Sequence, residues 1–277
     1  MKRGKLTLVP VGGLANRMFS VASAYNICRN AGVDLRIIWF RDWALNARFY
    51  EIFKPIEVEH LQLRDCKPLD YLLNDRPRKK NFFIPRLPQM LMYDRAIYEN
   101  SVTELRNSGF DFISWVNRGG SYLANYQNIG QYEDKLFTAL FCPVDEVMDV
   151  VQRNCDSFSG NTIGVHIRRT DHIISIKESP TELFVNAVKS EIDEHDDTKI
   201  YLATDDQPTK HEFLSLFGDR VVTMEAAAAR GNVEGIRGGL VDMWTLSRTA
   251  KIFGSANSTF SVMASKLGQN NLIVLRK

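Results

Sequence analysis

The sequence has no long hydrophobic run, no pair of neighbouring cysteines and no strong excess of charge of one sign. Its four cysteines, Cys28, Cys66, Cys142 and Cys155, are far apart and form no CxxC motif, so neither a zinc site nor a small disulfide scaffold is predicted. A formal net charge of +2 is far from the strongly basic balance that non-specific nucleic-acid binding needs. These absences predict reduced thiols in a cytoplasmic protein without a nucleic-acid partner.

No hydrophobic segment is long enough to span a membrane. The N-terminal stretch "MKRGKLTLVPVGG" has a basic start, but its apolar run is short and ends in glycines, which argues against a signal sequence. We therefore expect at most peripheral membrane association. A length of 277 residues with 44% hydrophobic and 25% charged residues is ordinary for one large or two modest globular domains.

The start of the chain alternates between strand and helix patterns. A short apolar strand over 6–11 leads into two glycines, apolar residues recur at helical spacing over 17–31, and a second strand follows over 34–40. This order predicts a βαβ opening of a parallel sheet. Residues 41–145 are rich in aromatic residues and prolines and give no clear assignment.

The second half of the chain shows the same alternation more clearly. Ser179, Pro180 and Glu182 resemble an N-cap, a first-turn proline and a capping glutamate, and they predict a helix to about residue 194. Together these patterns predict an α/β protein with an N-terminal domain over 1–150 and a Rossmann-like domain over 151–277. The strands expected in the second domain are 162–169, 199–206, 220–224, 251–255 and 272–276.

Polar residues and glycines gather where the predicted strands end. Any one of them is more commonly a cap or an ion-pair residue, but several strand ends that converge on one edge predict a ligand site. The candidates are Gly12, Gly13, Asn16, His166, Arg168, Arg169, Asp171, Asp205, Asp206, Ser255, Asn257 and Ser258.

The segment "GVHIRRTD" over 164–171 is the most informative of these strand ends. Consecutive residues on an extended chain point to opposite faces, so one arginine can face a ligand while the other pairs with acidic groups such as Asp171 or Asp205. Arginine is always charged and its planar fork suits phosphate oxygens. With the amides of a helix that starts near Ser258, this pattern predicts an anionic ligand, for which a diphosphate is the leading candidate.

These motifs carry a resemblance to a known family. "GVHIRRTD", "YLATDD" and "IRGGLVDMWTLSRTAKIFGSANSTFSVMASKLG" resemble, in order, the three C-terminal motifs of the α1,6-fucosyltransferases over about 162–268. "GGLANRMFSVASAYNICRNAG" and "YLANYQNIGQYEDKLF" are similar to segments of the α1,2-fucosyltransferases. The resemblance implies a GT-B fold, with two facing Rossmann-type domains and the active site in the cleft between them. It also implies inverting, metal-independent transfer of fucose from GDP-β-L-fucose, the donor substrate, to a hydroxyl of a glycan or glycolipid, with no cofactor.

The resemblance also implies roles for individual residues. Arg168 matches the arginine that binds the β-phosphate and stabilises the leaving GDP, and His166 and Asp242 match residues that contact the guanine. The other matches are Asp205 and Asp206 as an acidic pair that fixes the arginines, Ser258 near the phosphates, and Gly12, Gly13 and Asn16 in a loop facing nucleotide and acceptor.

The sequence departs from the family at the general base. Where the α1,6 enzymes have a lysine and then a glutamate, this chain has His172 and Ile176, so Asp171, His172 and Glu178 all stay open as the base. A transferase for another GDP-sugar and a catalytically silent GDP-sugar- or glycan-binding protein are the alternatives. A metal site at the consecutive pair Asp205 and Asp206 is a weaker one, because a strand sends neighbours to opposite faces.

Overall fold

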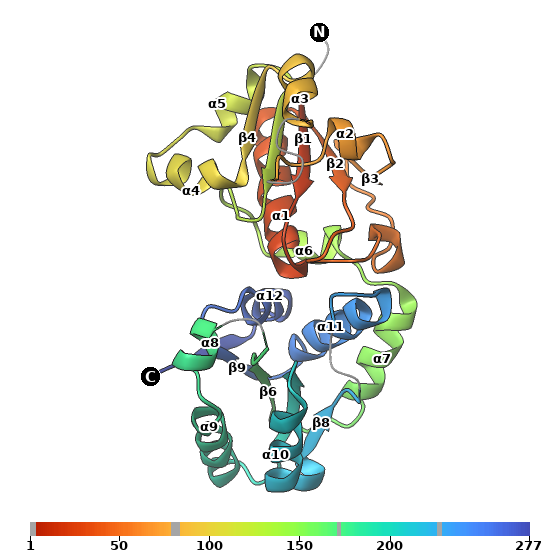
Figure 1. Ribbon diagram of the computed structural model, residues 1–277. Coiled ribbons are helices and arrows are strands. Elements are labelled where there is room, and N and C mark those ends of the chain that lie inside the picture. Colours follow the sequence, from red (N-terminus) through yellow and green to blue (C-terminus); the bar gives the residue numbers. More distant parts are fainter. Residues whose placement is uncertain (1–3, 79–83, 171–172, 226–228) are drawn as a thin grey trace. The chain divides into compact units, whose positions relative to one another are not determined.

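A computed structural model describes residues 4–78, 84–170, 173–225 and 229–277 (Figure 1). The chain divides into two compact units, Met1–Cys142 and Pro143–Lys277, and each contains one five-stranded sheet. Helix α7 (Asp145–Cys155) packs against α11 (Val233–Leu246) of the second unit. The expected boundary after residue 150 cuts through this helix, whereas the division in the structure precedes it.

The sheet of the first unit is parallel throughout, in the order β3-β2-β1-β5-β4. Its strands are β1 (Lys5–Pro10), β2 (Asp34–Trp39), β3 (Leu61–Asp65), β4 (Arg95–Tyr98) and β5 (Ser121–Asn125). The helices are α1 (Leu14–Ala31), the 3-10 turn η1 (Phe49–Glu51), α2 (Asp70–Leu73), α3 (Arg86–Met92), α4 (Glu99–Asn107), α5 (Phe112–Asn117) and α6 (Lys135–Leu140). The predicted βαβ opening is confirmed. The segment that the sequence left unassigned supplies β3, β4 and β5.

Helix α1 covers one face of this sheet, against β1 and β2. It starts directly after Gly13 and stops at Gly32, whose left-handed φ of 64° suits glycine. The opposite face carries Val9, Ile38 and Tyr122, which pack with side chains from the segments around β4. Burial of the central strand β1 on both faces explains why residues 6–11 form a short apolar run.

The second unit repeats the design with the strand order β10-β9-β6-β7-β8, again all parallel. The strands are β6 (Thr162–Ile167), β7 (Lys199–Thr204), β8 (Val221–Thr223), β9 (Lys251–Ser255) and β10 (Asn271–Leu275). Besides α7 and α11, the helices are α8 (Ile173–Glu178), α9 (Thr181–Glu194), α10 (Gln207–Phe217), η2 (Gly218–Arg220) and α12 (Thr259–Gly268). All five predicted strands are confirmed: β6, β7 and β8 are shorter than predicted, β9 has the predicted bounds, and β10 is shifted by one residue toward the N-terminus.

Strand β6 is buried along its whole length. Val165 and Ile167 lie in the core that Phe184 of α9 and Phe213 of α10 complete. On the other face, a Cβ added to Gly164 would lie 2.8 Å from the Leu246 side chain of α11. Glycine is therefore required here for α11 to approach the sheet closely.

Two local predictions need correction. The strand ends at Ile167 rather than continuing through the two arginines. Ser179 does not cap α9: the N-cap residue is Pro180, and the Ser179 hydroxyl donates to Leu275 O at 2.5 Å and accepts from Ala256 N at 2.8 Å. These two contacts join α9 to the ends of β9 and β10 instead.

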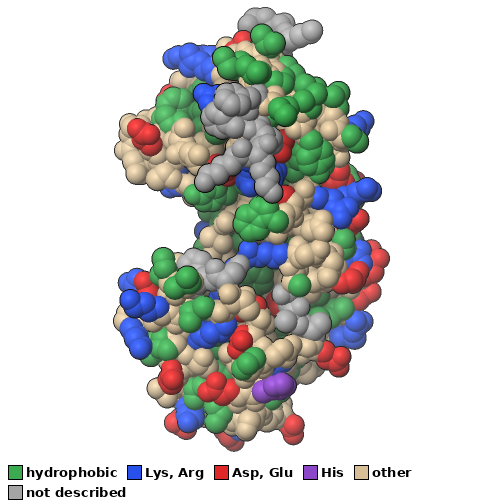
Figure 2. Space-filling model, viewed as in Figure 1, with side chains coloured by type: hydrophobic (Ala, Val, Ile, Leu, Met, Phe, Trp, Pro, Cys, Tyr) green, Lys and Arg blue, Asp and Glu red, His purple; other side chains and the backbone are tan. Residues whose placement is uncertain are grey.

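The surface carries charges of both signs, and Figure 2 shows them interspersed on the viewed face of each unit. This mixture agrees with the small net charge of +2. Of the helices in the described part of the chain, none is both long enough and apolar enough to cross a membrane.

Candidate functional site

The carboxyl ends of β6 and β9 are joined by one buried hydroxyl. Ser255, which is 1% exposed, donates to His166 O at 3.2 Å and accepts from Arg168 N at 3.1 Å. The serine therefore fixes the point at which the chain leaves the sheet and presents Arg168, which is half-buried. This places two of the predicted strand ends side by side, in agreement with strands that pair in parallel.

The second arginine binds protein groups. The Arg169 guanidinium donates through Nη2 to Ser179 O at 2.8 Å and to Thr181 Oγ1 at 2.9 Å, and through Nη1 to Arg168 O at 3.2 Å. Burial lowers the pKa of Arg169 although nearby carboxylates act to raise it. The Arg169 guanidinium is therefore engaged in holding the segment that leads into α9. The sequence predicted an acidic partner for one arginine, whereas these three acceptors are two carbonyls and a hydroxyl.

The consecutive aspartates stabilise two different local structures. Asp205 accepts from Arg169 N at 2.7 Å and from the Thr170 hydroxyl at 2.6 Å, which holds the turn after β6. Asp206 is the N-cap of α10 and accepts from Thr209 N at 2.9 Å. Both carboxylates thus support the shape of the strand-end region.

His166 is buried at 8% exposure on the face of β6 opposite the Val165 core. Its Nδ1 lies 2.7 Å from Ser261 Oγ, and its ring stacks on Phe260 with centroids 4.7 Å apart. Burial, aided by the charge of Arg168, lowers the pKa of His166 from 6.5 to about 4. The imidazole is therefore neutral at physiological pH.

Helix α12 begins beside this group of residues. Its N-cap is Ser258, yet the Ser258 side chain makes no capping hydrogen bond. The hydroxyl is buried and has no partner among the residues that the structure describes. Asn257 adopts a left-handed φ of 57°, which turns the chain sharply into the helix. An unpartnered buried hydroxyl at a helix N-terminus is a ready donor for an anion.

Asp242 lies deeper on the same face as His166. It is 5% exposed and accepts from the Tyr201 hydroxyl at 2.7 Å. Tyr201 pairs with Gly164, two residues before His166 along β6. Burial raises the pKa of Asp242 from 3.8 to about 7, and the tyrosine hydrogen bond offsets part of that effect. The carboxyl group thus changes protonation near neutral pH.

Of the three candidate bases, Asp171 and His172 lie outside the described residues. Glu178, at the end of α8, is half-buried, and its Oε2 accepts from Asn257 Nδ2 at 3.4 Å. Glu178 O also accepts from Lys277 N at 2.8 Å. These contacts hold α8 beside the turn that precedes α12.

The glycine loop of the first unit follows β1. Gly12 has a left-handed φ of 83°, and a Cβ there would lie 3.3 Å from Asn16 Nδ2, so the turn requires glycine. Gly13 is the N-cap of α1, and Asn16 is half-buried in its first turn.

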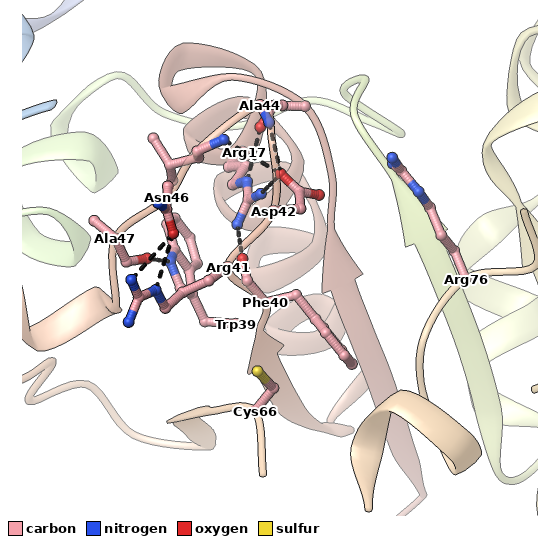
Figure 3. A network of polar contacts seen from close by, with 12 residues as sticks. Arg17, Trp39, Phe40, Arg41, Asp42, Ala44, Asn46, Ala47, Cys66 and Arg76 are labelled. Carbon is pink, nitrogen blue, oxygen red and sulfur yellow. Dashed lines mark hydrogen bonds and ion pairs between the residues drawn. The ribbon is translucent and has the colours of Figure 1, made fainter. Parts of the chain in front are cut away.

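Arg17 fixes this loop, and the sequence analysis missed it. It is 0% exposed and donates through Nε to Gly12 O at 2.8 Å, through Nη1 to Phe40 O at 2.5 Å and through Nη2 to Asp42 Oδ1 at 3.0 Å (Figure 3). Its guanidinium also lies 4.9 Å from the Trp39 ring. Burial lowers the pKa of Arg17 to about 10, so it stays charged. A charged residue on the buried face of a helix, directly after a glycine turn, is the signal that could have found it.

No protein-family model matches the chain, and no curated protein sequence matches it. Solved structures do match. A NodZ α-1,6-fucosyltransferase soaked with GDP-fucose has a TM-score of 0.67 at 20% identity, over 96% of this chain and 93% of that one. The NodZ of Bradyrhizobium has a TM-score of 0.65 at 19% identity, over 95% and 93%. A mutant of Arabidopsis thaliana FUT1 in complex with GDP has a TM-score of 0.65 at 14% identity, over 99% and 70%.

This chain has the fold of those fucosyltransferases. POFUT1 in complex with GDP is also similar, with a TM-score of 0.60 at 10% identity, over 99% of this chain and 98% of that one. The predicted GT-B-type α/β architecture is confirmed by these matches and by the two parallel five-stranded sheets. Within the described ranges, no group of three His, Cys, Asp or Glu side chains is arranged to hold a metal ion.

Proposed function

We propose that the protein is an inverting, metal-independent glycosyltransferase that moves fucose from GDP-β-L-fucose to a hydroxyl of a glycan or glycolipid. The observation that carries the proposal is the convergence, at the ends of β6 and β9, of Arg168 with the unpartnered Ser258 hydroxyl at the start of α12. A fixed guanidinium and helix amides form a binding site for a diphosphate. Solved structures with this fold contain GDP or GDP-fucose.

The proposed reaction transfers fucose in one displacement. The acceptor oxygen attacks the anomeric carbon as the bond from that carbon to the β-phosphate oxygen breaks, and the electron pair leaves with GDP. Arg168 and Ser258 stabilise the negative charge that develops on the diphosphate. A carboxylate takes the acceptor proton, and Glu178 is the candidate for this role within the described residues.

The guanine is assigned to the face of β6 that carries His166. Its Nδ1 is engaged with Ser261, so Nε2 is the ring nitrogen that we assign to the base. Asp242, whose pKa is raised to about 7, presents a carboxyl group that accepts hydrogen bonds when ionised. The second unit is thus proposed as the nucleotide-sugar domain and the first as the acceptor side.

Isothermal titration of GDP, GDP-fucose and GDP-mannose tests the donor assignment. We expect GDP and GDP-fucose to bind, with turnover or slow hydrolysis of GDP-fucose that survives EDTA. If neither binds at millimolar concentration, the proposal is wrong. Tight GDP binding without turnover over an acceptor panel would instead favour a silent binding protein, for which Ile176 at the family's glutamate position is the supporting observation.

Substitution of Arg168 tests the phosphate site directly. Arg168→Ala should weaken GDP binding by about 2 kcal/mol, the size of a charge-assisted hydrogen bond. Arg248→Ala is the matched control, because Arg248 is an exposed arginine of the same unit. Equal GDP affinity in the two folded variants would contradict the role given to Arg168.

A further inference from the structure

Two exposed aromatic side chains stand on either side of the glycine loop in the first unit. Trp43 is 76% exposed and follows β2, and Tyr126 is 40% exposed and follows β5. In the sheet, β1 lies between these two strands, and Gly12 follows β1. Neighbouring strands are about 4.8 Å apart, so the two strand ends lie about 10 Å apart. The segments that carry the two aromatic residues therefore leave the sheet on either side of the strand that leads to Gly12.

The turn that carries Trp43 is fixed by a buried charge. Asp42 and Leu45 exchange two backbone hydrogen bonds, at 3.2 and 3.1 Å, which places Trp43 and Ala44 at the tip. Asp42 Oδ1 accepts from Ala44 N at 3.0 Å and from Leu45 N at 3.2 Å, as well as from Arg17 (Figure 3). Arg17 thus ties the Trp43 turn and the Gly12 loop to the same guanidinium.

The turn that carries Tyr126 is built in the same way. Asn125 is 0% exposed, its Oδ1 accepts from Gln127 N at 3.0 Å, and its Nδ2 donates to Gln127 O. Asn125 O accepts from Val11 N at 2.8 Å, which ties this turn to the end of β1. A Cβ at Gly12 would lie 3.5 Å from the Tyr126 Cβ, so the tyrosine stands directly beside the glycine.

Single exposed apolar side chains are common and need no explanation. Trp43 and Tyr126 differ from such residues because each sits at a tip that a buried Asp or Asn side chain fixes, and the two flank a left-handed glycine. A preformed tip lowers the entropy lost when a ligand binds. We propose that Trp43 and Tyr126 are acceptor-binding residues that stack on the sugar rings of a neutral glycan.

The surroundings fit a sugar better than a protein partner. A pyranose has an apolar C–H face that suits the negative face of an aromatic ring, and an edge of hydroxyl groups. Arg41 and Asn46 flank the Trp43 turn in the chain, and Arg41 donates to Asn46 Oδ1 through Nε at 3.2 Å and through Nη2 at 3.1 Å, so polar side chains lie close to Trp43 in the sequence. A neutral glycan with this mixed surface is the substrate class that we assign. The assignment rests on the proposed transfer of fucose to a glycan.

The tryptophans provide a selective probe. The other three, Trp39, Trp115 and Trp244, are 0%, 2% and 5% exposed, so acrylamide quenching of fluorescence reports chiefly on Trp43. The full chain would be titrated with chitotetraose, cellotetraose and maltotetraose. We expect at least one of these sugars to protect Trp43 from quenching. Tyr126→Ala keeps the probe and should weaken that protection up to about tenfold.

Trp43→Ala removes the probe, so saturation-transfer NMR would measure its affinity for the same sugar. We expect a loss up to about tenfold. Leu91→Ala is the matched control, since Leu91 of α3 is 91% exposed in the same unit, and it should bind like the parent. The inference is overturned if no sugar protects Trp43, if Trp43→Ala binds the sugar unchanged, or if protection rises with protein concentration alone, which would indicate contact between two copies.

Titration of GDP into the same preparations separates this inference from the proposed function. If the parent protein binds GDP but none of the sugars, and both variants bind GDP as well as the parent does, only the stacking role of Trp43 and Tyr126 is rejected. Sugar protection without any GDP binding would reject the fucosyltransferase assignment while the stacking role of the two rings stands.

Discussion

Arg17 in the first unit and Ser258 in the second are both buried polar residues near strand ends, but they differ in their hydrogen bonds. In the first unit, the Arg17 guanidinium donates to two carbonyls and to Asp42, so its hydrogen bonds maintain the shape of two turns. In the second unit, the Ser258 hydroxyl is buried without a partner in the described part of the chain. His166 there is kept neutral rather than paired with a carboxylate. Arg17 is thus fully engaged within the protein, whereas Ser258 is the buried hydroxyl that we propose for a ligand.

This difference has a physical reason. A diphosphate brings its own negative charge, so the site that binds it needs donors that are already in place and not yet engaged. A neutral sugar ring brings no charge, and an edge that receives it gains more from rigid, correctly placed rings. Substitution of Arg17 should therefore cost stability, and substitution of Ser258 should cost ligand affinity.

The largest effect is expected for Arg17→Met. Removal of the guanidinium leaves Asp42, whose side chain is 7% exposed, without its cationic partner, and such losses cost about 3–5 kcal/mol. Urea unfolding, with hydrogen exchange of α1 and of residues 40–46, measures the change in the free energy of unfolding.

The matched control for Arg17 is Arg29→Met on the same helix. Arg29 pairs with Glu133 at 3.1 Å, but the two side chains are 41% and 48% exposed, so its loss should cost less than about 1 kcal/mol. If Arg17→Met and Arg29→Met lowered the free energy of unfolding equally, the buried ion pair of Arg17 and Asp42 would not stabilise the first unit more than an exposed pair does.

The second prediction concerns pH dependence in the second unit. Folding lowers the pKa of His166 from 6.5 to about 4. As the pH falls, the unfolded chain therefore protonates this histidine before the folded chain does, and stability falls by about 2 kcal/mol from pH 7 to pH 5. The raised pKa of Asp242, about 7 against 3.8, has the opposite sign: the folded chain takes up a proton first, so stability rises by a similar amount as pH falls. The two effects nearly cancel in the parent protein.

Substitution of either His166 or Asp242 should therefore expose the pH dependence of stability that the other residue causes. His166→Gln should become more stable from pH 7 to pH 5, and Asp242→Asn less stable, as followed by hydrogen exchange of β6 and β7. Exchange of α1 gives an internal reference, because the pKa of Arg17, at about 10, lies well above this range. Slopes of the same sign in both variants would show that burial does not control these groups as described.

The same two regions explain how far the sequence could be interpreted. In the second unit, apolar strands alternate regularly with helices, and "GVHIRRTD" contains the end of β6, so the fold and the residues at the strand ends were predictable. In the first unit, β3, β4 and β5 are four or five residues long and are separated by irregular segments, which hides their periodicity. In neither unit could contacts between residues far apart in the chain be predicted from the sequence. The Ser179 hydroxyl accepts from Ala256 N and donates to Leu275 O, which overrides a local capping pattern. The sequence analysis assigned no role to Arg17.

The smallest effect, and the sharpest separation of affinity from stability, is expected at Ser258. Ser258→Ala removes a buried hydroxyl that has no partner in the described residues, so stability should be unchanged or slightly higher. GDP binding, measured by titration calorimetry, should weaken by about 1 kcal/mol, the value of one hydrogen bond. Ser261→Ala is the comparison, since its hydroxyl lies 2.7 Å from His166 Nδ1 and its loss should lower the urea midpoint. A fall in stability at Ser258 equal to that at Ser261, with GDP affinity unchanged, would mean that the hydroxyl serves the fold. The second unit would then resemble the first in using its buried polar groups for shape.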